Sequence, residues 1–184
     1  MARLLAVCVV SALRPDAGTV GITAIDKQPV EGSVRVGPYG MYADVQADRK
    51  RHGGLEKALY AYAQEDADFW AGELGHDLPA GWFGENLRTE GIDVNAARIG
   101  ERWSIGAAEV EVTMPRSPCQ TFARWVGETV DPAAERGWVR RFGEVGRLGP
   151  YLRVTRNGRI AAGDEIEVVY RPDDAPSVLE VFRS

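Results

Sequence analysis

One cysteine stands where the sequence predicts the start of a helix. Cys119 lies in the segment Pro115-Arg116-Ser117-Pro118-Cys119-Gln120. Ser117 suits the N-cap, Pro118 suits the first helical position, and Gln120 completes a capping box with Ser117. Cys119 would then be the second helical residue, where free backbone N–H groups and the nearby Arg116 favour a thiolate. A thiolate can bind a soft metal or attack an electrophile. The competing interpretation is an inert buried cysteine, and the local pattern does not choose between the two.

Two other segments could bind a ligand. Residues 44–54 bring Arg51, His52 and Gly53 to the start of a helix, a combination that suits phosphate or another anion. Taken alone, a solvated loop is the better interpretation of that segment. Residues 81–87 contain Asn86, whose amide could hydrogen-bond the edge of a heterocycle or simply cap a turn.

The composition excludes several functional classes. The chain has 184 residues and a net charge of -5, which argues against a general nucleic-acid binder. Two cysteines cannot form a disulfide framework, and two histidines give little support for a protein-ligated zinc site. Cys8 lies in an apolar run and is expected to be a buried structural residue. No run reaches membrane-spanning length, so we expect a soluble, cytoplasmic protein without a membrane partner.

Most of the chain is expected to form short strands separated by glycine turns. Alternating or β-branched residues predict strands at 4–10, 19–25, 33–36, 110–114, 151–155 and 166–170. The first of these has too short an apolar run to favour a signal peptide. Asn157-Gly158 predicts a type I′ hairpin turn, so the pattern is that of a barrel or sandwich.

Helices are expected at a few places along the chain. Helical spacing predicts one or two helices over residues 55–74, with their aromatic residues in the core. Asp131-Pro132 predicts the start of a helix that continues to about Phe142. The thiol segment predicts a short helix that ends at Gly127. We expect a single domain over residues 1–184, with 171–184 as a loosely attached tail.

The thiol segment is one of six groups of residues that occur in order over nearly the whole chain. The groups are 26–30, 44–48 with 52–54, 83–87 with 91, 99–102, 115–119, and 149–154 with 162–166. In content and order they resemble the MOSC family, the C-terminal domain of molybdenum-cofactor sulfurase, and especially its stand-alone YiiM-like branch. A single group would be weak, but the ordered set is specific.

The resemblance implies a mainly β fold, namely a closed barrel of short antiparallel strands with a few peripheral helices. It also implies a site for the molybdenum cofactor, in which Cys119 ligates the metal or carries sulfur as a persulfide. Asn86 would lie near the pterin. The other cofactor contacts that the resemblance implies are Lys27, Arg51, His52, Gly53 and Arg116. At the level of the superfamily, the resemblance also implies pyridoxal phosphate binding.

Three functions follow from the resemblance. The first is reduction of small N-hydroxylated or N-oxide compounds, with electrons from an external donor protein because no flavin or nicotinamide fingerprint is visible. The second is a sulfur or cofactor carrier served by a sulfur donor protein, and the third is a binding domain that uses the pocket for another, specialised metabolite. The resemblance does not determine whether the protein is a monomer or a homodimer.

Two differences from the YiiM-like branch bear on the substrate and the redox partner. Because the sequence ends at Ser184, we expect the further three-helix segment of that branch to be missing. Its Arg49-Lys50-Arg51 run is also more basic than the usual pattern.

Overall fold

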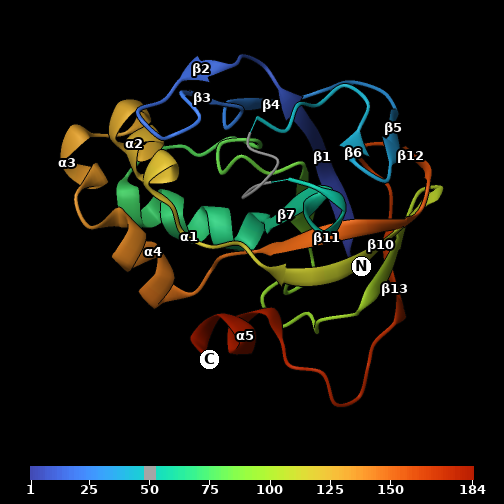
Figure 1. Ribbon diagram of the computed structural model, residues 1–184. Helices are drawn as coiled ribbons and strands as arrows, with labels where there is room; N and C mark the ends of the chain where they lie inside the picture. Colours follow the sequence, from blue (N-terminus) through green and yellow to red (C-terminus); the bar gives the residue numbers. More distant parts are fainter. Residues whose placement is uncertain (48–52) are drawn as a thin grey trace.

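An eight-stranded sheet forms the centre of the molecule in a computed structural model, which describes residues 1–47 and 53–184 (Figure 1). The strand order is β13-β9-β10-β11-β7-β8-β1-β4. The strands are β1 (Arg3–Val10), β4 (Lys27–Pro29), β7 (Leu59–Ala63), β8 (Leu87–Glu90), β9 (Arg102–Ile105), β10 (Ala108–Pro115), β11 (Pro150–Arg156) and β13 (Ile166–Tyr170). The β7–β8 pair is parallel and the other neighbouring pairs are antiparallel.

Two smaller sheets and the helices surround this centre. The second sheet contains β12 (Gly158–Ile160), β5 (Val34–Gly37) and β6 (Gly40–Met41), and β2 (Arg14–Pro15) pairs with β3 (Ile22–Thr23) as a hairpin. The helices are η1 (Leu55–Lys57), α1 (Gln64–Leu74), α2 (Gln120–Thr129), α3 (Pro132–Glu135), α4 (Trp138–Val145) and α5 (Val178–Arg183). Helices α1 to α4 gather at one end of the molecule (Figure 1). Among the described helices, none has the length and apolar character needed to cross a membrane.

The core has an aliphatic part and an aromatic part. Along β10, Ala108, Val110 and Val112 are buried and alternate with more exposed residues, which confirms the predicted strand. The aromatic part lies under helices α1, α2 and α4, where Trp70, Trp138, Phe122 and Phe142 contact one another with ring centres 4.8–5.7 Å apart. This cluster fixes helix α2, which carries the thiol at its start.

The predicted closed barrel is wrong, because within the described residues the sheet stays open between β13 and β4. Strand β4 has three residues and pairs only with the end of β1, from Cys8 to Val10. The other end of β1 reaches the segment before β13 through a single bridge, Arg3 to Glu165. A continuous ladder would need a longer strand at that junction. The fold is therefore mainly β with peripheral helices, as expected, but without closure.

One or two helices were predicted over residues 55–74, and this is correct for 55–57 (η1) and 64–74 (α1) but wrong for the residues between them. Residues 59–63 form β7, and all five are buried between β8 and β11. A strand covered on both faces loses the apolar–polar alternation, so its sequence is hard to tell from a buried helix. Helix α1 begins at Gln64 and provides the crossover that makes β7 and β8 parallel.

The predicted hairpin at Asn157-Gly158 is also wrong. Strand β12 pairs with β5 of the second sheet, so the chain leaves the central sheet at this point. No non-glycine residue in the described part of the chain has a positive φ, which excludes a type I′ turn with Asn157 at its centre. A Cβ at Gly158 would lie 2.3 Å from the Ala107 carbonyl, so glycine is required for close backbone approach.

The remaining predicted elements are partly correct. Asp131 caps α3 by accepting from the Ala133 N–H at 2.8 Å, but the helix stops at Glu135 and a new one begins after Gly137, whose φ is 76°. Of residues 19–25, only Ile22–Thr23 form a strand. The final segment is packed rather than loose, since α5 has a capping box and buries Val178 completely.

Candidate functional site

A cavity of about 520 Å³ lies between the β2–β3 hairpin, the start of α2 and the central sheet. Four of the predicted site residues line it: Lys27, Asn86, Arg116 and Cys119. Gly53 is described but is not among the lining residues. Arg51 and His52 lie outside the described residues. The structure thus brings the thiol, two cations and the amide of the sequence prediction into one space.

Cys119 occupies the N-cap of α2 and not the second helical position that the capping-box pattern predicted. Its backbone is extended, with φ −142° and ψ 160°, and no side chain caps the helix. Pro118 favours extended backbone at Ser117, and the first turn begins one residue beyond the thiol. The thiol is half-buried and still lies at the positive end of the helix dipole.

Arg116 is the buried cation of the cavity. Its guanidinium lies over three aromatic rings, at 4.2 Å from the centre of Phe122, 5.2 Å from Tyr60 and 5.7 Å from Phe142. In the described part of the chain its Nη1 is buried and has no hydrogen-bond partner. Burial opposes the charged form, but the nearby Tyr60 and Cys119 outweigh it and raise the pKa of Arg116. The group stays cationic and has a donor that no described residue uses.

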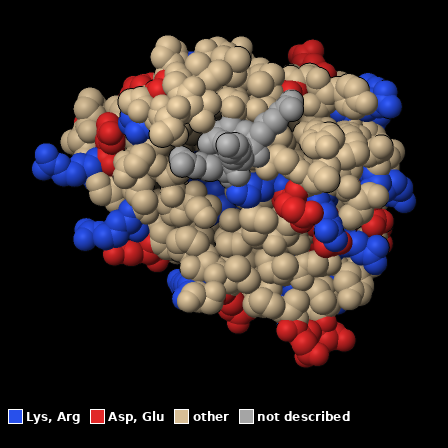
Figure 2. All heavy atoms as spheres, in the orientation of Figure 1, with Lys and Arg blue, Asp and Glu red and all other residues tan. Residues whose placement is uncertain are grey.

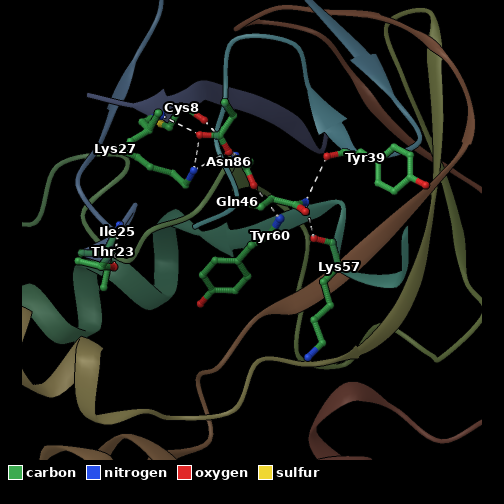
Figure 3. A network of polar contacts seen from close by, with 11 residues as sticks. Cys8, Thr23, Ile25, Lys27, Tyr39, Gln46, Lys57, Tyr60 and Asn86 are labelled. Atoms are coloured by element: carbon green, nitrogen blue, oxygen red, sulfur yellow. Dashed lines mark hydrogen bonds and ion pairs between the residues drawn. The ribbon is translucent and has the colours of Figure 1, made fainter. Parts of the chain in front are cut away.

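Lys27 and Asn86 meet at a buried carboxylate, Asp44. Lys27 Nζ lies 2.5 Å from Asp44 Oδ2, and Asn86 Nδ2 donates to the same oxygen at 2.7 Å. The Asn86 amide also donates to the Cys8 carbonyl and accepts from the Tyr60 N–H, both at 3.2 Å (Figure 3). Asp44, which the sequence did not single out, therefore holds both Lys27 and Asn86 in place. Their proposed contacts to a cofactor remain predictions.

Asp16 joins the β2–β3 hairpin to helix α2. Its two carboxylate oxygens accept from Arg124 Nε and Nη2 at 2.8 Å each, and Thr121 Oγ1 lies 3.1 Å away. The hydrogen bonds from Arg124 hold the pKa of Asp16 below its ordinary value. The sequence did not predict this contact between Asp16 and Arg124, because the two residues lie 108 positions apart.

Replacing Asp16 by asparagine is expected to loosen the hairpin and to cost about 1–2 kcal/mol of stability, since a charge-assisted, two-point contact is lost. The lowered pKa means that the carboxylate stabilises the fold at neutral pH. That contribution is lost as the pH falls through the lowered pKa. Urea unfolding of wild type and Asp16→Asn should differ fully above about pH 5 and converge only as the pH falls below the lowered pKa of Asp16. A constant difference down to acidic pH would contradict the role of the charge.

Cys8 has the structural role that the sequence predicted. It is fully buried in β1, and burial is the main cause that raises the pKa of its thiol to about 12. A thiol in this state is neither a nucleophile nor a metal ligand at neutral pH. Of the two cysteines, Cys119 is thus the candidate for thiol chemistry.

The described lining of the cavity is net cationic. Its cations are Lys27, Lys57, Arg116 and Arg124, against the carboxylates Asp16 and Asp44. Lys57 was not predicted, and neither was Gln46, whose amide donates to the carbonyls of Tyr39 and Lys57 (Figure 3). No cluster of three or more His, Cys, Asp or Glu occurs among the described residues. The arrangement suits an anionic ligand, and a metal there would depend on donors that the ligand brings.

Charge on the outer surface is arranged differently. On the face shown in Figure 2, Lys and Arg side chains are dispersed among Asp and Glu and do not form one continuous basic patch. On that face, the positive charge is therefore not gathered into a surface patch.

Comparison with known proteins identifies the family. Residues 48–167, more than half of the chain, match the family model described as the MOSC domain. The chain belongs to the MOSC domain family. This confirms the resemblance drawn from the ordered motifs.

Three curated relatives are each 32% identical to this MOSC chain. They are the uncharacterized protein YflK of Bacillus subtilis (85% of this chain, 67% of the relative), YiiM of Escherichia coli (83% and 66%), and a protein of Gibberella moniliformis named "Reductase" (88% and 28%). The crystal structure of YiiM from Geobacillus stearothermophilus superposes with a TM-score of 0.78 and 27% identity, over 100% of this chain and 83% of that one. The chain thus spans about two thirds of YflK and YiiM and about a quarter of the fungal protein.

Proposed function

We propose that this MOSC chain binds the molybdenum cofactor and reduces N-hydroxylated or N-oxide compounds, with Cys119 as a ligand to molybdenum. One observation carries the proposal. A half-buried thiol and a buried guanidinium, one of whose donors no described residue uses, line the same cavity, whose described lining is net cationic. Relationship to a protein named as a reductase supports the redox assignment.

The residues present fit the cofactor. Among the described residues Arg116 Nη1 is a buried donor without a partner, and a buried donor of this kind is costly unless a ligand uses it. The start of α2 has no side-chain cap, so its N–H groups can also face an anion. Arg116, Lys27 and the start of α2 would hold the phosphate or other charged oxygens, and Asn86 would lie beside the pterin. When bound, the cofactor supplies two-electron chemistry at the metal.

The chain itself contributes binding, orientation and charge. Cys119 provides a soft thiolate donor, and Arg116 keeps a positive charge beside it. Asp44 fixes Lys27 and Asn86, and Asp16 fixes the hairpin over α2. In the overall reaction the N–O bond of the substrate breaks and its oxygen leaves as water, with two electrons from an external donor protein and two protons from solvent.

A sulfur carrier is the second candidate. The observation that favours it is that Cys119 is half-buried and that no His, Cys, Asp or Glu cluster of metal-binding size surrounds it in the described residues. A persulfide on Cys119 needs a sulfur donor protein and an acceptor, but no metal.

Analysis of the protein purified from cofactor-producing cells separates the two functions. The reductase proposal expects molybdenum and pterin at about one per chain, together with reduction of an N-hydroxylated compound by reduced methyl viologen. The carrier expects cyanide-labile sulfur on Cys119 and no molybdenum. Protein without molybdenum in cells that load other molybdenum enzymes would overturn the first proposal.

Arg116 offers a test of the fit with two readouts. Arg116→Met is expected to weaken cofactor retention by roughly tenfold to a hundredfold, the effect of losing one or two charge-assisted hydrogen bonds. The free energy of unfolding of the cofactor-free protein should change by less than about 1 kcal/mol. Losing a buried charge with an unpaired donor offsets the lost contacts with the three rings. A matched loss of stability and retention would instead indicate a purely structural arginine.

A further inference from the structure

The cavity changes character from its buried end to its mouth. The charged groups at the buried end are almost inaccessible, with the Arg116 residue 5% exposed and the Lys27 side chain 8%. At the mouth the exposed lining residues include the apolar Val20, Ile22 and Val45, which are 44–45% exposed, beside the polar Thr19 and Gln120. A bound group that needs charge compensation belongs at the buried end, whereas a molecule that enters and leaves meets the mouth first.

The apolar part of the mouth gathers exposed side chains around one cavity. Exposed apolar side chains that occur singly need no explanation, but those gathered around a cavity mark a binding site. Val20, Ile22 and Val45 are exposed large hydrophobic residues that all line the same cavity. Small apolar residues of the hairpin and of the segment before residue 48, among them Ala24 and Ala47, extend the wall.

The wall is preformed by its contacts with α2. Asp16 and Arg124 join the hairpin to the helix through two hydrogen bonds of 2.8 Å. Arg14, in β2, reaches Asp26 at 3.2 Å and lies 5.1 Å from the ring centre of Trp125. Contacts from β2 and from the turn after it thus hold the hairpin, with Val20 and Ile22, against α2, so little conformational entropy is lost when a ligand binds there.

We propose that Val20, Ile22 and Val45 form a specificity wall that takes the apolar body of the substrate. The substrate class is then N-hydroxylated compounds with a hydrocarbon or aromatic body, in preference to small polar ones. The inference rests on the proposed function for the reacting group, but the binding itself does not require turnover. A resident cofactor is the alternative occupant of the wall, and the depth of the charged groups argues against it.

A matched pair of compounds tests the wall. N-phenylhydroxylamine has an apolar body and N-methylhydroxylamine lacks one, while the reacting group is the same. Binding of each to the purified protein is followed by NMR titration without a reductant, so that no turnover occurs. We expect the phenyl compound to bind at least about tenfold more tightly, since each buried carbon contributes to affinity.

The double variant Val20→Ser/Ile22→Ser should weaken binding of the phenyl compound by on the order of tenfold and leave the methyl compound unchanged. Both side chains are exposed, so the fold should tolerate serine. Val169→Ser is the matched control, because Val169 is 45% exposed on β13 and does not line the cavity. With turnover, the double variant should raise KM for the phenyl compound and leave kcat unchanged.

Two results would overturn the inference. One is equal binding of the phenyl compound to the wild type and to the double variant. The other is loss of molybdenum and pterin from the double variant with unchanged binding of the phenyl compound, which would assign the wall to the cofactor. If the protein holds no molybdenum and reduces nothing, yet the double variant still binds the phenyl compound more weakly, the wall is supported and only the reductase proposal fails.

Discussion

Replacing Cys119 by serine is expected to abolish both molybdenum retention and reductase turnover. A serine hydroxyl is a hard oxygen donor that stays protonated at neutral pH, whereas a thiolate is the soft ligand suited to the metal. Removing groups that merely support a ligand typically costs about 10- to 100-fold in metal affinity or activity, so loss of the ligand itself should exceed that range. Metal analysis and turnover with reduced methyl viologen measure the two effects on the same preparation.

Cys8 provides the matched control for this substitution. It is the other cysteine of the chain, it is fully buried, and its thiol pKa is raised to about 12. Cys8→Ala should therefore leave molybdenum content unchanged and cost only stability. In the cofactor-free protein, iodoacetamide at neutral pH should alkylate Cys119 and spare Cys8, as mass spectrometry of the peptides would show. Retention of molybdenum in Cys119→Ser would show that the thiol is not a ligand to the metal.

Local signals in the sequence were enough to predict several elements of the fold. The alternation in β10 and the Asp131-Pro132 helix start depend on neighbours along the chain, and both are confirmed. The predictions of helix at 59–63 and of a hairpin turn at Asn157-Gly158 were wrong, because these segments depend on residues far away along the chain. The first is buried on both faces, and the second is placed by pairing with β5, a strand more than a hundred residues away. Tertiary contacts decided both cases.

The residues of the candidate site also differ in whether a local sequence signal predicts them. Cys119, Arg116 and Asn86 could be singled out because each lies in a short segment with unusual composition, and the family resemblance added Lys27. Asp44 lay inside a recognised segment, but nothing local showed that its carboxylate would join Lys27 and Asn86. Asp16 and Arg124 have no local signal at all. The residues that position a site are found only when the chain is folded.

A buried ion pair beneath the site gives the largest expected effect on stability. Arg88 and Glu85 are 1% and 0% exposed, and Arg88 Nη2 lies 2.6 Å from Glu85 Oε1. The same carboxylate oxygen accepts from the Gly81 N–H at 2.7 Å, and Arg88 also donates to the Pro79 carbonyl at 3.0 Å. The pair thereby holds the loop that leads into Asn86, so its loss should disturb the cavity as well as the fold.

Arg88→Met is expected to destabilise the protein by about 3–5 kcal/mol, because it leaves Glu85 as an uncompensated buried charge. Glu85→Gln/Arg88→Met removes both charges and keeps an acceptor for Gly81, so it should recover much of that loss. Arg141→Met is the exposed control, since the Arg141–Glu73 pair has side chains 44% and 49% exposed and should contribute less than about 1 kcal/mol. Urea unfolding of the three variants measures the differences. If Arg88→Met costs no more than Arg141→Met, the buried pair does not hold the loop, and the position of Asn86 must depend on Asp44 and on the Tyr60 and Cys8 backbone instead.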